Sequence, residues 1–152
     1  MPLDPTPLKF SSAKTAFRSS FIGQHVGPLA RAYSGMVLLE LALKEHHDDL
    51  AMKHDVPSLL QKLTAGQPCN QVIRARLRQR IGALRGALTE LRFYNPTRTP
   101  CNLDPGNYPG MRYLRHVDDH PDGTPSPAIE KLCRQVEETV NFLKKDFRLA
   151  TI

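Results

Sequence analysis

The hydrophobic positions of this chain recur every three to four residues, the spacing that places them on one face of a helix. The clearest case is a single apolar stripe near the end of the chain: Ile129, Leu132, Cys133, Val136, Val140, Leu143 and Phe147. Ser126 and Pro127 suit the N-cap and first turn of a helix, while Glu130 and Lys144 complement its dipole. The pattern therefore predicts a helix over 127–147.

Other stretches carry a similar pattern. A broad apolar face runs over 28–52, a short leucine-rich stretch over 57–63, and a third stripe over 70–93. A weaker pattern covers 11–22, and no stretch shows the alternation of period two that is typical of strands. The sequence thus predicts an all-α fold, an antiparallel bundle of four or five helices.

The chain length of 152 residues fits one domain. We assign residues 1–24 to an N-terminal tail with a possible short helix and residues 25–152 to the helical domain. The first ten residues contain three prolines and no apolar run of the kind a secretory signal needs. The widely spaced Cys69, Cys101 and Cys133 form no CxxC pair, which favours structural thiols in a reducing cytoplasm.

Positive charge is concentrated in one segment. Residues 71–98 contain seven arginines and a single acid, Glu90, so this segment carries +6, the net charge of the whole chain. Helical spacing places Arg74, Arg78, Arg85 and Arg92 on one flank of the apolar stripe. A concentrated basic surface indicates an anionic partner, most simply RNA or another nucleic acid. The alternative is a solvated helix face that happens to be rich in arginine.

Two glycines, Gly82 and Gly86, lie inside the same predicted helix. Each costs roughly 1 kcal/mol in a helix relative to alanine. We therefore expect them to permit close packing against a neighbouring helix.

The candidate chemistry lies in the segment 95–126, which is rich in proline and glycine and has no helical pattern. Within it, 111–120 concentrates arginine, histidine and aspartate. Arg115 can hold a phosphate and stabilise developing charge, and His120 can move a proton near neutral pH. This pair suits metal-free RNA cleavage with the 2′-hydroxyl as nucleophile. The alternative is a polar loop whose side chains, including His116, form local hydrogen bonds.

Two further polar features leave alternatives open. Glu40 falls inside an apolar helix face one turn before Lys44, so it either forms an i, i+4 salt bridge or orients an active-site group. A metal-dependent phosphohydrolase is a third functional alternative, because histidine and aspartate can bind a divalent ion. The candidate ligands are His116 with His120, and His46 or His47 with Asp48 or Asp49. We nevertheless expect no metal and no cofactor.

Four short motifs occur in an order that resembles a known family. They are Leu39–Lys44, with a glutamate and an Ala-Leu-Lys run; His54–Leu60, a His-Asp turn before leucines; Arg112-Tyr113; and Arg115–His120, an Arg-x4-His pattern. In these motifs the chain resembles HEPN domains, small helical bundles of prokaryotic toxins, defence systems and nucleotidyltransferase partners. The resemblance covers roughly residues 28–149.

The resemblance implies a homodimer that cleaves RNA without a metal ion and leaves a 2′,3′-cyclic phosphate, as a toxin or an antiviral defence enzyme. By position, Arg115 binds the scissile phosphate and His120 is the acid/base. His116 gives polar support, and Glu40 or Asp55 orients the site.

RNA contacts are expected from five further residues: Arg112, Tyr113, Arg74, Arg78 and Arg85. The expected protein partners are a cognate antitoxin or a nucleotidyltransferase, and no membrane is expected. In active family members the signature lies at the edge of a helix, whereas prolines and glycines flank it here. This difference favours the alternative function, a non-catalytic module of the same fold that binds a partner protein or nucleic acid.

Overall fold

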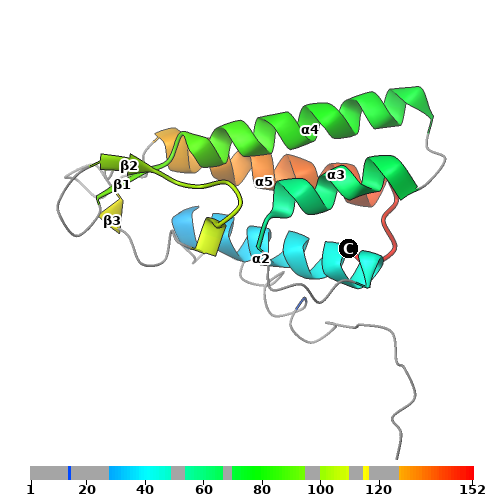
Figure 1. The fold of residues 1–152 in the computed structure, drawn as a ribbon, viewed down its shortest axis with the longest axis horizontal. Coiled ribbons are helices and arrows are strands. Elements are labelled where there is room, and N and C mark those ends of the chain that lie inside the picture. Colours follow the sequence, from blue (N-terminus) through cyan, green and yellow to red (C-terminus); the bar gives the residue numbers. More distant parts are fainter. Residues whose placement is uncertain are drawn as a thin grey trace, which may run out of the picture.

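Four helices form a bundle in the computed structural model (Figure 1). The residues that the structure describes are 14, 28–48, 54–66, 70–94, 100–109, 115–116 and 127–152. The helices are α2 (Pro28–His47), α3 (Val56–Gly66), α4 (Gln71–Thr89) and α5 (Pro127–Lys145). The predicted helical bundle is thereby confirmed. In the described part of the chain, no helix combines the length and apolarity that crossing a bilayer requires.

The helix starts follow the sequence signals more closely than the helix ends. Asn70 caps α4, since its side-chain oxygen accepts a hydrogen bond from the Ile73 amide at 2.8 Å. By contrast, α4 ends at Thr89 rather than near residue 93. Helix α2 ends at His47 rather than near residue 52, because Asp48 takes a left-handed conformation with φ 51°.

A small antiparallel sheet lies at one end of the bundle (Figure 1). Its strands are β1 (Arg92–Tyr94), β2 (Pro100–Asn102) and β3 (Arg115–His116), in the order β2-β1-β3. The expectation that the chain contains no strand is therefore wrong. Strands of two or three residues are too short to show a recognisable alternation of polar and apolar positions.

The hydrophobic core lies where the helices meet. Helix α5 packs against α2 and α4, and α3 packs against both α2 and α4. The large side chains buried almost completely include Met36, Leu38, Leu39, Leu43, Leu60, Leu77, Leu84, Leu88, Leu91, Tyr108 and Leu132. Burial raises the pKa of the Cys133 thiol, which fits the predicted structural role of that residue.

The C-terminal residues contact helix α2. The Thr151 hydroxyl donates to the Ala42 carbonyl at 2.7 Å. Lys14 is buried beside it, where its ammonium group donates to the Thr151 carbonyl at 2.6 Å and pairs with Glu45 at 2.7 Å. The other residues of the predicted tail and short helix lie outside the described residues.

Candidate nucleic-acid interface

Helix α4 presents three arginines that form no ion pair with another described residue, which we call the arginine face: Arg74, Arg78 and Arg85. The side chains of Arg78 and Arg85 are exposed, and Arg74 is half-buried. The Arg74 Nε atom is buried and has no hydrogen-bond partner among the described residues. Helix α4 contains no acidic residue, so no carboxylate one turn away neutralises this face. These exposures are consistent with the predicted clustering of Arg74, Arg78 and Arg85 on one flank. Arg92, which was predicted on the same flank, belongs instead to strand β1.

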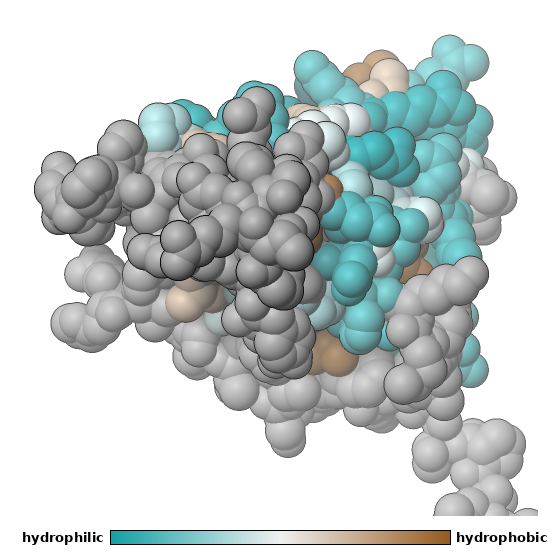
Figure 2. All heavy atoms as spheres, turned by 60° about the vertical axis from the view of Figure 1, so that its left-hand side comes forward, coloured by the Kyte–Doolittle hydropathy of each residue, from teal (hydrophilic) through white to brown (hydrophobic). Residues whose placement is uncertain are grey.

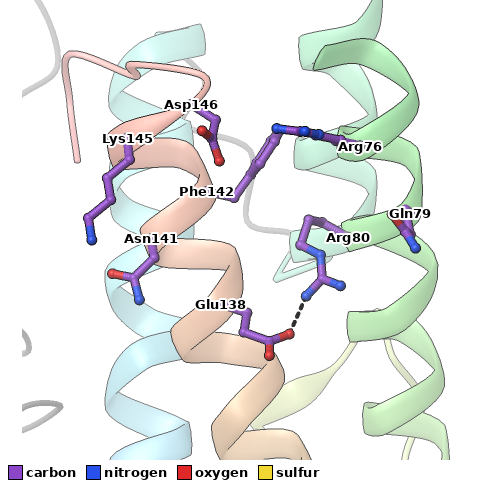
Figure 3. Close-up of a pocket in the computed structure, with 8 residues that line it drawn as sticks. All are labelled: Arg76, Gln79, Arg80, Glu138, Asn141, Phe142, Lys145 and Asp146. Carbon is purple, nitrogen blue, oxygen red and sulfur yellow. Dashed lines mark hydrogen bonds and ion pairs between the residues drawn. The ribbon is translucent and has the colours of Figure 1, made fainter. Parts of the chain in front are cut away.

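The other flank of α4 is different, because carboxylates of the C-terminal part of the chain lie beside its arginines. Arg80 is 2.5 Å from a Glu138 carboxylate oxygen and 3.1 Å from the Gln135 side-chain oxygen. A groove between the two helices is lined by Arg76, Gln79, Arg80, Glu138, Asn141, Phe142, Lys145 and Asp146 (Figure 3). Because two carboxylates share this groove with three cations, it suits a polyanion less well than the arginine face does.

The glycines of α4 do not pack against another helix. Gly82 and Gly86 are both exposed, and a Cβ atom added at either position would meet no atom of a described residue within 4 Å. The expectation of close helix packing at these glycines is therefore wrong. Both residues leave bare backbone on the exposed surface of α4, in the same helical turns as Arg78 and Arg85.

We predict that Gly82→Ala stabilises the free protein. Alanine gains up to about 1 kcal/mol over glycine in an exposed helix, and nothing obstructs the added methyl group. Urea denaturation of the two proteins measures this gain. A loss of stability would contradict the open position of Gly82 on the helix surface.

The surface of the described residues is largely polar. Most of the described residues visible in Figure 2 are hydrophilic, with a few hydrophobic ones among them. Among the described residues, Val72 is the exposed large hydrophobic side chain. An interface on this surface therefore depends mainly on charge and hydrogen bonds.

The predicted Arg115–His120 motif is described in part. Arg115 and His116 form β3, where they pair with Tyr94 and Phe93 of β1. These two residues thus belong to a strand, whereas the resemblance places them at the edge of a helix. Arg112, Tyr113 and His120 lie outside the described residues, so the convergence of Arg115 and His120 stays a prediction.

A buried carboxylate, Glu40, gathers polar groups from three separate segments. One of its oxygens is 2.5 Å from His54 Nδ1 and 3.4 Å from the Lys44 ammonium nitrogen. Its other oxygen accepts a hydrogen bond from the Tyr108 hydroxyl at 2.8 Å. The predicted salt bridge between Glu40 and Lys44 is confirmed. The carboxylate also contacts His54, and its role in orienting an active-site group stays a prediction.

Local turn chemistry holds His54 and Tyr108 in place. The Asp55 carboxylate accepts from the Ser58 amide at 3.1 Å and so caps α3. His54 pairs with Asn107 in an isolated parallel bridge. A Cβ atom on Gly106 would lie 3.2 Å from an Asp55 oxygen, so glycine permits the approach of this turn. Asp55 therefore caps the start of α3 and contacts the turn at Gly106.

Sequence reasoning missed Tyr108 and the pairing of His54 with Glu40. The ring of Tyr108 lies against those of His54 and Tyr33, with centroid separations of 6.2 and 5.8 Å. The proline and glycine residues before Tyr108 indicated a turn. They did not indicate a partner 68 positions away.

The described residues contain no group of three or more histidine, cysteine or acidic side chains placed to hold a metal ion. The rings of His46 and His47 pack edge to face, 5.0 Å apart, and His47 Nε2 lies 3.1 Å from the Leu59 carbonyl oxygen. Burial, with a smaller contribution from His47, lowers the pKa of His46. The metal ligands considered at 116 and 120 include a residue that is not described.

Comparison of the chain with models of protein families, with curated proteins and with solved structures found no match. Two features therefore indicate a function. One is the arginine face, and the other is the polar cluster of Glu40, Lys44, His54 and Tyr108.

Proposed function

We propose that the protein binds RNA on the arginine face of α4. The observation that carries this proposal is the set of three arginine side chains that pair with no described carboxylate, on a helix that contains no acidic residue. At a rise of 1.5 Å per residue, Arg74 and Arg85 lie about 16 Å apart along the axis, enough to follow several phosphates of one strand. Gly82 and Gly86 add exposed backbone between and beside these cations.

We further propose that the bound RNA is cleaved by a metal-independent, HEPN-like endoribonuclease reaction. Strand β1 begins three residues after α4 ends, and it pairs with the strand that contains Arg115 and His116. An RNA strand that follows α4 to its C-terminal end thus approaches the predicted Arg-x4-His motif. The resemblance adds the homodimer and the role as a toxin or an antiviral defence enzyme in the cytoplasm.

A second candidate is a non-catalytic HEPN-like module that binds a partner protein, such as an antitoxin or a nucleotidyltransferase, or nucleic acid without cleaving it. It is favoured by the position of Arg115 in a strand, away from the helix edge that the resemblance implies. In this alternative the arginine face still binds an anion, but the protein releases RNA unchanged.

Arg78→Gln tests the proposed interface. If Arg78 contacts a phosphate, its loss should weaken RNA binding and reduce the slope of log K against log salt by about 0.7 for a single strand. Arg134→Gln is the matched control. Arg134 is an exposed arginine on α5 that makes no hydrogen bond or ion pair with a described residue, so both variants lose one surface charge.

Fluorescence titration of an RNA oligonucleotide at several salt concentrations gives both quantities. The proposal predicts a clear change for Arg78→Gln and little change for Arg134→Gln. Equal effects of the two substitutions would indicate a nonspecific charge effect and would remove the arginine face from the functional model.

A further inference from the structure

His54 has the arrangement of an oriented proton acceptor. Its side chain is 45% exposed, whereas that of Glu40 is 8% exposed. The Glu40 carboxylate engages Nδ1. Among the described residues Nε2 has no hydrogen-bond partner. A carboxylate on Nδ1 holds the proton on that nitrogen and leaves the lone pair on Nε2, as in a catalytic carboxylate–histidine pair.

The buried side of this pair is rigidly held. Tyr108 donates to the second oxygen of Glu40, and Lys44 lies beside the first. Glu40 therefore already has a hydrogen-bond donor and a cation without His54, so the histidine is not needed to satisfy the carboxylate. A role in proton transfer requires an accessible imidazole nitrogen, which the half-exposed side chain of His54 provides.

We propose that His54 is a catalytic base that accepts the 2′-hydroxyl proton of bound RNA, with Glu40 as its positioning residue. This inference rests on the proposed RNA binding and names the group that activates the nucleophile. The resemblance assigns the acid/base role to His120, so the two assignments compete and can be separated by experiment.

The step balances without a metal or an oxidant. His54 Nε2 takes the 2′-hydroxyl proton, the 2′-oxygen bonds to the adjacent phosphorus, and the bond from phosphorus to the 5′-oxygen breaks. The electron pair of that bond goes to the 5′-oxygen, which takes a proton from water. The products are a 2′,3′-cyclic phosphate and a 5′-hydroxyl end, and the imidazolium returns its proton to water.

Only a short segment separates strand β2 from Asn107, the residue that pairs with His54. Strand β2 ends at Asn102, and Asn107 already pairs with His54. Five residues of chain span at most about 18 Å. An RNA that reaches the sheet is therefore within a few nucleotides of His54.

His54→Asn is the most informative substitution. The asparagine amide can replace Nδ1 as a donor to Glu40, but it supplies no basic nitrogen at the position of Nε2. Cleavage of an RNA oligonucleotide is measured in EDTA, and affinity is measured with the 2′-deoxy analogue, which cannot react. We expect kcat to fall at least about 100-fold while the Kd of the analogue stays within about twofold.

His54→Ala supplies a second, independent readout. Added imidazole should restore part of its cleavage activity, because a free base replaces the missing one. A structural defect would not respond to imidazole. If one substitution unfolds the protein, as judged by circular dichroism, the other decides the question.

The remaining outcomes separate the two proposals. Wild-type cleavage that persists in His54→Asn overturns the inference, and its loss in His120→Ala would then assign the base to His120. RNA binding without cleavage by the wild type also overturns the inference but leaves RNA binding intact. Absence of RNA binding would contradict the proposed function itself.

Discussion

Leu132→Ala should lower the free energy of unfolding by about 2–5 kcal/mol, since Leu132 is fully buried on the face of α5 that meets α2 and α4. The substitution removes apolar contacts and leaves a cavity, and both effects destabilise the bundle. Urea or guanidinium denaturation, followed by circular dichroism, measures the change.

Arg134→Ala is the matched control for this prediction, because Arg134 is exposed on the same helix two positions away. Its effect should stay within about 0.5 kcal/mol. A nearly neutral Leu132→Ala would mean that α5 does not present this face to the core.

Glu40→Ala should cost about 3–5 kcal/mol, the range observed when one partner of a buried ion pair is removed. The alanine removes the Glu40 oxygen that accepts from the buried Tyr108 hydroxyl, and it removes the counter-charge of Lys44. It also removes one of the contacts between α2 and the segments that contain His54 and Tyr108. Chemical denaturation again gives the value.

Glu138→Ala separates this effect from the general loss of a carboxylate. Glu138 also pairs with a cation, Arg80, but its side chain is 48% exposed. Water screens that pair, so its loss should change stability by less than about 1 kcal/mol. Similar losses for the two substitutions would contradict the view that Glu40 is a buried structural centre.

The helices were predictable because each carries an apolar stripe several turns long. Such a stripe identifies the core face, as Leu132 and Leu84 show. Helix ends are less well determined, since one residue can end a helix against the pattern. The left-handed Asp48 does so for α2, and the start of β1 limits α4.

The features that sequence reasoning missed depend on contacts between distant residues. Nothing near Tyr108 in the sequence indicates that its hydroxyl meets Glu40. Gly82 was misinterpreted for a related reason, because a glycine in a helix has the same sequence signature whether it faces a neighbour or solvent. The concentration of arginine in α4 was visible directly, because charge composition requires no tertiary contact.

The most direct test of the central claim is an NMR titration of the protein with a single-stranded RNA oligonucleotide, which maps the RNA interface. RNA binding on the arginine face predicts chemical-shift changes at the Gly82 and Gly86 amides and at the Nε–H groups of Arg78 and Arg85. The side-chain amide of Asn141, which lines the groove between α4 and α5 (Figure 3), should change little. Changes confined to that groove, or none on α4, would contradict the proposed interface.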